Sequence, residues 1–258
     1  MVDLEKMLHR EPIADRGISV VIPAHNEAAN IDAVVGGISA AFDRMGRGHE
    51  IIVVNDGSTD STGELVEKLA GSNKRVRVIQ HSKREGYGAA LRSGFQAAKY
   101  PLVLQLDGDN QYDSAEVERL LGAINRTDIV CGYRETPPPE QRRLGNWFYR
   151  WVLRVVLAVH VRDVDCGFRL FRRAALRRIP IQSNGQFANA EILAKASFMN
   201  MLVTEVGVTC RPRSVGHVAQ TREDRRHVLR EAAHVFRRPQ FHTPQSGSDR
   251  LDSAGHAA

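Results

Sequence analysis

Two aspartates one residue apart, Asp107 and Asp109, are the clearest candidates for chemistry in this sequence. They follow the apolar run LVLQL (residues 102–106), which predicts a short strand buried within a sheet. Gly108 between them allows the backbone to turn tightly. Open α/β sheets bind ligands at the carboxyl ends of their strands, where this pair would lie. Hard oxygen ligands at this spacing suit Mg²⁺ or Mn²⁺, with a substrate diphosphate completing the coordination shell.

Two simpler interpretations of this stretch compete with a metal site. Asp-Gly-Asp-Asn is an ordinary turn composition, and taken alone it favours a turn. The residues from Asp107 to Glu118 also imitate a calcium-binding loop. However, Tyr112 stands where such a loop needs glycine, and the stretch follows a strand rather than a helix, so we exclude the calcium loop. The choice between a turn and a metal site depends on the rest of the chain.

Composition and charge restrict the class of protein. The 258 residues, 42% of them hydrophobic, suffice for one large α/β core. Cys131, Cys166 and Cys210 fit neither a disulfide framework nor a zinc site, so we expect a reducing cytoplasm. We find no signal-peptide core and no apolar run of the roughly 18 residues that a membrane span needs. The net charge of +6 includes eleven arginines against four acidic residues between positions 134 and 178. This favours a phosphate-bearing partner or an anionic membrane surface, and no recognition motif points to nucleic acid.

The apolar segments predict alternating strands and helices in the first half of the chain. Strands are expected at 18–22, 50–54, 75–79, 102–106 and 128–131, with helices at 31–42, around 65–69, at 89–99 and at 114–124. Asn26 or Asn30 would cap the first helix, and Asp60 or Ser61 the second. Five strands with intervening helices imply a doubly wound, mainly parallel sheet with helices on both faces.

The alternation stops after Gly132. The segment 141–160 predicts an amphipathic helix with an arginine stripe beside several aromatic residues. Such a helix could lie on a membrane surface, or it could pack on the sheet with a solvated basic edge. An extended loop or strand at 163–171, a helix at 189–198 and a strand at 202–210 are expected to follow, and the composition from residue 239 onward predicts disorder.

Six motifs occur in an order that resembles a known family. They are VVIPAHNEAANI, EIIVVNDGSTDST, GYGAALRSGFQAA, LVLQLDGDNQ, GYR and DVDCGFRLFRR. Together they resemble family 2 glycosyltransferases of the GT-A fold, and most closely the branch of dolichol-phosphate mannose synthases and other polyprenyl-phosphate glycosyltransferases. The resemblance covers residues 18 to about 213. It implies a GDP- or UDP-linked sugar donor, a divalent metal (Mg²⁺ or Mn²⁺) and inversion at the anomeric carbon.

The resemblance also divides the chain into regions. We expect an N-terminal lead at 1–16, a single GT-A catalytic domain at 17–215, and a basic tail with a disordered end at 216–258. Within the domain, 17–132 would be the half that binds the nucleotide sugar, and 133–215 the acceptor half. With no spanning segment, a prenyl acceptor would be met at the cytoplasmic face of the membrane, by peripheral contact.

For the donor, the resemblance implies that the loop after the first strand holds the base and ribose. The residues concerned are Pro23, Ala24, Asn26 and Glu27. Asn26 and Glu27 also suit an ordinary helix start, and His25 suits a solvated loop position. Asp56 would accept hydrogen bonds from the base, although Asp-Gly is also a common turn.

The diphosphate is expected at a glycine-rich helix start. Gly86 and Gly88 allow close backbone approach there, and helix N-termini attract phosphate. Many relatives have arginine just before the first glycine of this loop. Glu85 stands there in this chain, with Lys83 and Arg84 upstream, and we assign the basic contact to Lys83.

The resemblance implies that Asp107 and Asp109 bind the metal, with Gln111 as a third contributor, directly or through water. The cation would neutralise charge on the leaving nucleotide. Candidates for binding the acceptor are Arg134, Asp163, Arg169, Arg211 and Arg213, the arginines because a guanidinium fork fits phosphate. Each arginine alone could equally be a solvated surface charge.

The expected function is transfer of a hexose, mannose being our first choice, to a polyprenyl phosphate. The alternatives are a family 2 enzyme with a hydroxyl acceptor, and a non-catalytic nucleotide-binding protein. A hydroxyl acceptor needs a general base, whereas a phosphate acceptor does not. Hydroxyl-acceptor members commonly have an acidic pair near the position of Glu191, but its neighbours here are apolar, and we expect Glu191 to face solvent or pair with an arginine. Asp163 and Asp165 remain candidate bases.

Overall fold

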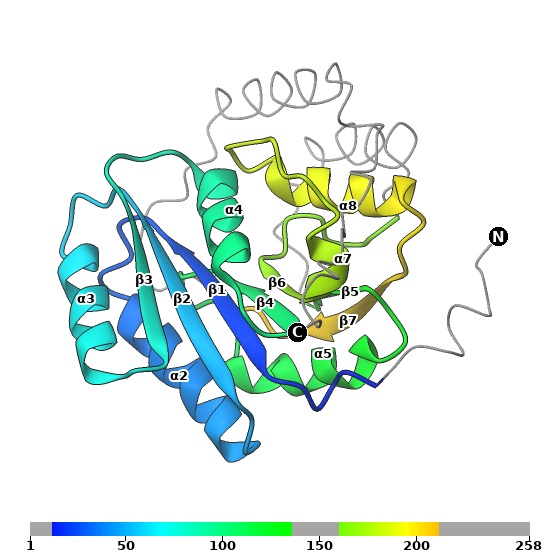
Figure 1. Ribbon diagram of the computed structural model, residues 1–258, viewed down its shortest axis with the longest axis horizontal. Helices are drawn as coiled ribbons and strands as arrows, with labels where there is room; N and C mark the ends of the chain where they lie inside the picture. Colours follow the sequence, from blue (N-terminus) through cyan, green and yellow to red (C-terminus); the bar gives the residue numbers. More distant parts are fainter. Residues whose placement is uncertain (1–11, 136–159, 212–258) are drawn as a thin grey trace, which may run out of the picture.

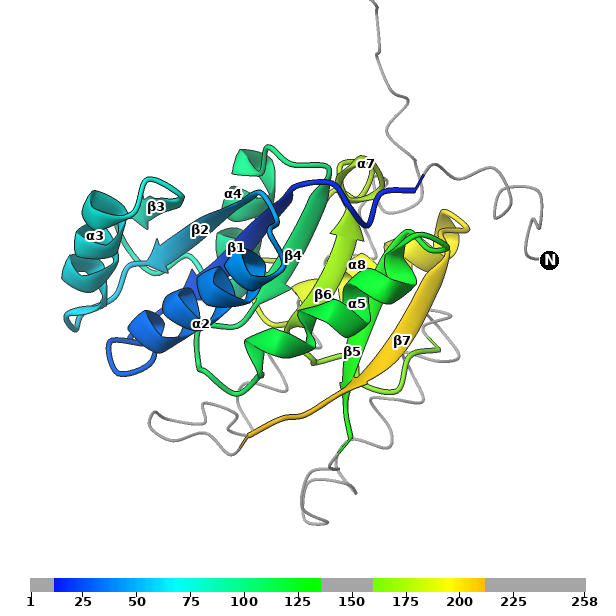
Figure 2. The same cartoon turned by 90° about the horizontal axis from the view of Figure 1, so that it is seen from below.

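The structure is a computed structural model that describes residues 12–135 and 160–211. These residues form one seven-stranded sheet in the order β3-β2-β1-β4-β6-β5-β7, covered by helices on both faces (Figures 1 and 2). The expected amphipathic helix at 141–160, apart from His160, lies outside the described residues. So do Arg213, the tail at 216–258 and most of the N-terminal lead.

The strands follow the apolar runs of the sequence. They are β1 (Ile18–Ala24), β2 (His49–Asp56), β3 (Val76–His81), β4 (Leu102–Leu106), β5 (Ile129–Arg134), β6 (Phe168–Arg172) and β7 (Val203–Val208). β1, β2 and β4 are buried at every position, as expected of strands covered on both faces. β2 and β5 extend further than predicted, so Asp56 and Arg134 lie within strands rather than after them.

The helices divide between the two faces of the sheet (Figures 1 and 2). One face carries α2 (Ile31–Arg44), α3 (Thr62–Ser72) and α5 (Val117–Ile124), the last preceded by the short 3-10 helix η1 (Ser114–Glu116). The other carries α4 (Tyr87–Ala97), α7 (Arg173–Leu176) and α8 (Ala188–Phe198). α4 begins two residues earlier than predicted, and α7 was not predicted. None of the helices in the described residues is long and apolar enough to cross a membrane.

The sheet is mainly parallel, as predicted, but β6 runs antiparallel between β4 and β5. The sequence predicted only an extended segment here, because a local pattern does not say which distant strand will be the partner. The pairing places Arg169 directly opposite Gln105, with both side chains on the same face. A segment of the expected acceptor half therefore completes the sheet of the nucleotide half.

The carboxyl ends of β1, β2, β3 and β4 meet at one edge of the sheet. The ladder between β1 and β4 stops at Val21, whereas β2 remains paired with β1 as far as Ala24. Pro23 has no backbone N–H to extend a ladder. Gly108 packs into the space beyond, where an added Cβ would lie 3.1 Å from the Pro23 carbonyl oxygen. The turn containing Asp107 and Asp109 therefore packs directly against the end of β1.

Candidate active site

Asp107 and Asp109 lie at the carboxyl edge of the sheet, immediately after β4. The Tyr87 hydroxyl donates a hydrogen bond of 2.7 Å to Oδ1 of Asp107. Gly167 closes the other side, because a Cβ there would lie only 1.9 Å from Asp107 Oδ2. The first carboxylate is thus held from two directions.

The electrostatics of this pair favour a cation. Burial and the neighbouring charge of Asp109 raise the pKa of Asp107 to about 7, while the hydrogen bond from Tyr87 and the charge of Arg169 oppose the shift. Two carboxylates that disfavour each other's ionisation are stabilised when a divalent ion lies between them. Within the described residues no group of three or more His, Cys, Asp or Glu side chains could hold a metal. The two carboxylates supply hard oxygen ligands of the kind that Mg²⁺ and Mn²⁺ prefer, and substrate phosphates and water could supply the others.

Gln111 lies next to the pair but is tied to the segment after β7. Its side-chain nitrogen donates to the Arg211 carbonyl at 3.2 Å, and the Arg211 amide donates to the Gln111 carbonyl at 2.7 Å. The amide oxygen of Gln111 is the atom suited to a cation. Arg211 therefore lies next to Gln111, and its guanidinium forms an exposed ion pair with Asp113 at 2.7 Å.

A buried polar network supports Asp107 from behind. Gln105 Nε2 donates to the Tyr87 hydroxyl at 2.8 Å and to Asn189 Oδ1 at 3.0 Å. Arg169 Nη1 donates to the same Asn189 oxygen at 3.1 Å. The network joins α4, β4, β6 and α8, so the orientation of the first carboxylate depends on four elements.

Arg169 corrects a prediction. Its side chain is completely buried and donates to carbonyl oxygens of Val164 and Asn189. In this conformation the guanidinium is not exposed, and it donates to protein groups rather than making the phosphate contact that we expected. Its role here is to lower the pKa of Asp107 through its charge and to hold Asn189 in place.

Asp56 at the end of β2 organises the loop that follows β3. It is 3% exposed and accepts hydrogen bonds of 2.8 Å from His81 Nδ1 and from the amides of Glu85 and Gly86. Burial raises its pKa, but these three donors outweigh burial, and the pKa lies below its ordinary value. Because a carboxylate has about four acceptor positions, about one remains for a nucleotide base.

The glycine-rich start of α4 also differs from the prediction. Gly86 adopts φ +108°, which favours glycine, and its amide is used by Asp56. The amides of Gly88 and Ala89 donate to the Asn184 carbonyl at 2.8 and 3.4 Å. These N–H groups therefore cap the helix from within the protein and do not offer the phosphate site that we predicted. Lys83 is exposed on the loop before them.

The loop after β1 is tied to the segment after β2. Asn26 has φ +57°, and its Oδ1 accepts from the Thr59 amide at 2.8 Å. Glu27 is 8% exposed and accepts a hydrogen bond of 2.7 Å from Asn30 Nδ2. Its charge contributes to the raised pKa of Asp107. His25, which we expected to be solvated, is half-buried, and its Nδ1 lies 2.8 Å from the Asp56 carbonyl. Pro23 and Ala24 are buried at the strand end.

Arg134 and Asp163, both predicted to bind the acceptor, bind each other. Arg134 Nε and Nη2 donate to the two oxygens of Asp163 at 2.6 and 2.9 Å. The hydrogen bonds to Asp163 raise the pKa of Arg134 above its ordinary value. The guanidinium fork that we predicted for an acceptor phosphate is therefore occupied by a carboxylate.

Glu191 neither faces solvent nor pairs with an arginine. It is completely buried, and its Oε1 lies 2.6 Å from Lys195 Nζ. The carboxylate also accepts hydrogen bonds from the amides of Gln182 and Ser183 at 2.9 and 2.8 Å. Lys195 Nζ also donates to the Pro180 carbonyl. This pair fastens the segment 180–183 to α8.

Four residues that organise the site were missed by the sequence interpretation. They are His81, Tyr87, Gln105 and Asn189. Gln105 carried a usable signal, because a single amide within an otherwise apolar strand must find partners in the core. His81, Tyr87 and Asn189 gave no such signal, because their roles depend on contacts between segments that are distant in the sequence.

The fold and the carboxylates at this sheet edge define a nucleotide-sugar transferase of the GT-A type. A crystal structure of glucosyl-3-phosphoglycerate synthase from Mycobacterium tuberculosis, in complex with Mn²⁺, UDP-glucose and phosphoglyceric acid, is similar, with a TM-score of 0.69 and 22% identity over 91% of this chain and 82% of that one.

The chain belongs to glycosyltransferase family 2, whose sequence model matches residues 19–180. It is 30% identical over 214 residues to the polyprenol monophosphomannose synthase of Mycolicibacterium smegmatis, covering 76% of this chain and 78% of the relative. It is 33% identical over 210 residues to the dolichyl-phosphate beta-glucosyltransferase ALG5C of Trichomonas vaginalis, covering 73% of this chain and 62% of the relative. These relatives confirm the expected likeness to the polyprenyl-phosphate branch of the family.

Proposed function

We propose that this protein transfers a hexosyl group, mannose in the first instance, from a nucleoside-diphosphate sugar to a polyprenyl phosphate. The observation that carries the proposal is the convergence of the Asp107–Asp109 pair with the loops after β1 and β2 at one edge of the sheet. The names of the relatives support the prenyl phosphate acceptor, and they include both mannose and glucose.

On the donor side, the chain's own groups would position the nucleotide sugar. Asp107 and Asp109 would hold Mg²⁺ or Mn²⁺, with Gln111 contributing directly or through water. Such a cation supplies neutralisation of the charge on the departing diphosphate. Asp56 and the loop at 23–27 would contact the nucleoside, and exposed Lys83 would contact a phosphate. In this arrangement the hydrogen bond from Tyr87 would fix the orientation of the first carboxylate.

On the acceptor side, the proposed nucleophile needs no general base. A phosphate monoester with a second pKa of roughly 6 is mostly dianionic at neutral pH. Two carboxylates that we considered as bases are otherwise engaged, Asp163 by Arg134 and Glu191 by Lys195. Their engagement favours an acceptor that arrives already ionised, and Asp165 is the carboxylate left to test as a base. Arg211 and Arg213 remain the residues that we propose to contact the acceptor phosphate. The protein would reach a prenyl acceptor through peripheral contact with the membrane surface.

A panel of GDP- and UDP-linked sugars, each with Mn²⁺, tests the proposal with two acceptors of equal chain length, a short polyprenyl phosphate and the matching polyprenol. We expect transfer from one donor to the phosphate and none to the alcohol. Transfer to an alcohol or glycan at a comparable rate would establish a hydroxyl acceptor instead. Donor binding with neither transfer nor donor hydrolysis would indicate a non-catalytic nucleotide-binding protein.

A further inference from the structure

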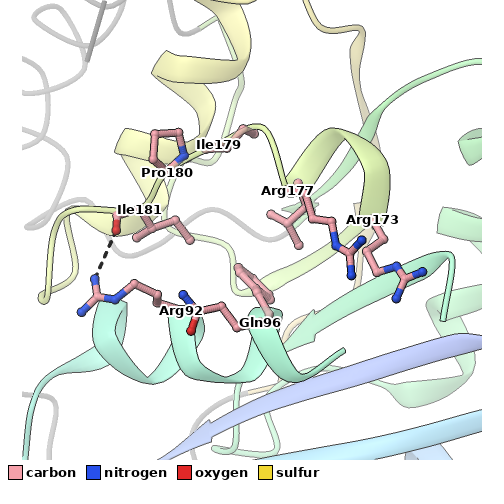
Figure 3. A pocket seen from close by; sticks show the side chains of 9 residues that line it. Arg92, Gln96, Arg173, Arg177, Ile179, Pro180 and Ile181 are labelled. Atoms are coloured by element: carbon pink, nitrogen blue, oxygen red, sulfur yellow. Dashed lines mark hydrogen bonds between the residues drawn. The ribbon is translucent and has the colours of Figure 1, made fainter. Parts of the chain in front are cut away.

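Three arginines surround a cavity of about 370 Å³ between α4, α7 and the segment 179–181 (Figure 3). Arg92 comes from α4 and Arg173 from α7, and Arg177 is the residue that follows α7. In Figure 3, Arg92 lies on one side of the cavity and the two other arginines lie on the opposite side. Cavities of roughly 300–1,000 Å³ are the usual size for small-ligand sites.

The cavity is separate from the Asp107–Asp109 edge. Tyr87, which contacts Asp107, begins α4, whereas Arg92 and Gln96 follow it by five and nine residues. At 1.5 Å per residue, the cavity wall lies about 8–13 Å further along the helix axis. The Arg173 amide donates to the Pro101 carbonyl, at the start of β4, so α7 lies toward the opposite edge of the sheet.

Among the described residues, the positive charge of this cavity has no carboxylate partner. The described residues that line it include no acidic residue. Arg92 donates to the Ile181 carbonyl and Asn184 Oδ1, and Arg173 donates to the Ala98 carbonyl. None of the three arginines forms an ion pair with a carboxylate in the part of the chain that the structure describes. Arg173 and Arg177 are four residues apart on one helical turn, a spacing at which like charges repel.

Apart from Gln96, the rest of the lining is apolar. It consists mainly of Phe95, Leu176, Ile179, Pro180 and Ile181, most of which are buried. A small inorganic anion would satisfy the guanidinium groups but would leave this surface exposed to water. A ligand that carries an apolar body next to its anionic group would cover both parts.

We propose that this cavity binds a phosphate monoester attached to an apolar body. The guanidinium forks of Arg173 and Arg177 match the geometry of phosphate oxygens, and an anion between them removes their mutual repulsion. The apolar body would lie against the side chains of Phe95 and Leu176. The ligand could be the headgroup of a membrane lipid or a soluble phosphate ester, which share this chemistry. The inference does not rest on the donor site. The acceptor proposed above shares this chemistry, and the Michaelis constants measured below distinguish this cavity from the acceptor site.

Calorimetric titration of the full chain tests the proposal with three probes: inorganic phosphate, octyl phosphate, and phosphatidylcholine vesicles with and without phosphatidic acid. The test variant is Arg173→Gln/Arg177→Gln. Its matched control is Arg126→Gln/Arg178→Gln, which removes the same charge from exposed positions that do not line the cavity. Circular dichroism checks that both variants fold, and the Michaelis constants for donor and acceptor are measured in parallel.

We expect octyl phosphate to bind the wild type more tightly than inorganic phosphate. The test variant should lose on the order of tenfold in affinity or one binding site, while the control stays within about twofold. Michaelis constants for donor and acceptor should not change in either variant. Loss of vesicle binding in the test variant alone would identify the ligand as a lipid headgroup. Binding of octyl phosphate without binding of vesicles would identify it as a soluble phosphate ester.

Three outcomes would overturn the proposal. The first is equal octyl phosphate binding by the test variant and the wild type. The second is an equal loss in the control variant, which would indicate only a diffuse positive charge. The third is a raised Michaelis constant for the acceptor in the test variant, because the cavity would then belong to the acceptor site.

Discussion

Tyr87 and Asp107 are joined by a hydrogen bond of 2.7 Å from the phenol hydroxyl to Oδ1, which connects the first residue of α4 to the first carboxylate of the site. Burial and the charge of Asp107 raise the pKa of Tyr87 well above its ordinary value, so the phenol stays protonated and donates. The phenol oxygen of Tyr87 also accepts a hydrogen bond from Gln105 Nε2. A tyrosine in this position orients the carboxylate without itself titrating near neutral pH.

Replacing Tyr87 by phenylalanine should therefore weaken metal binding. Removal of a group that orients a metal ligand typically lowers affinity by about 10–100-fold. Mn²⁺ titration followed by electron paramagnetic resonance measures this without relying on turnover. Tyr100→Phe, which removes a hydroxyl from a half-buried tyrosine outside the network, serves as the control. Unchanged Mn²⁺ affinity in Tyr87→Phe would refute a role for this hydrogen bond in the metal site.

Activity should require a divalent cation held through Asp107 and Asp109. We expect Asp109→Asn to abolish nearly all turnover while leaving the fold intact, because the amide cannot supply the negative charge that a hard cation favours. Turnover is measured with added Mn²⁺ and again with chelator, and folding is checked by circular dichroism. Full activity of the variant in chelator would contradict a metal requirement.

Without metal, Asp107 should make the stability of the protein depend on pH. Its pKa is about 7 in the folded state against 3.8 ordinarily, so between these values the folded state binds more protons than the unfolded state. Stability therefore falls as pH rises through this window. Asp107→Asn removes the effect, so in chelator the melting temperature of the variant relative to wild type should rise from about pH 5 to about pH 8. A constant difference would show that Asp107 ionises normally.

Glu191→Gln should destabilise the fold and leave the chemistry in place. The substitution leaves Lys195 buried without its counter-charge, and breaking a buried pair typically costs about 3–5 kcal/mol. Urea denaturation measures the loss, and Glu191→Gln/Lys195→Met, which removes both charges, should recover part of it. Transfer per folded molecule should persist in the single variant. A loss of several orders of magnitude in turnover, with normal stability, would instead make Glu191 a catalytic base.

The rate of transfer should follow ionisation of the acceptor rather than of a protein base. If the nucleophile is a phosphate monoester, the logarithm of the rate should rise with pH up to its second pKa, roughly 6, and then level off. Asp163→Asn and Asp165→Asn should each retain measurable transfer at saturating donor. A profile that shifts in either variant, with donor binding unchanged, would favour a hydroxyl acceptor and a protein base.

Much of the fold could be predicted from local sequence patterns. Long apolar runs predicted the strands of the parallel part of the sheet, because buried strands need apolar side chains on both faces. Asp107 and Asp109 could be placed at the carboxyl edge because they directly follow such a run. The order of six motifs was sufficient for the family, since it depends on residue types and spacing alone.

Tertiary structure decided which polar groups are already occupied. Asp56 binds the loop after β3 and Arg134 binds Asp163, although both looked available for substrate in the sequence. Glu191 binds Lys195, where we expected solvent or an arginine. These partners come from other elements, and for Arg169 the antiparallel insertion of β6 decides its burial. A sequence fixes the charge and hydrogen-bonding capacity of each side chain. Which distant segment satisfies that capacity depends on strand pairing and packing across the whole chain, because buried polar groups must find partners wherever the fold brings them.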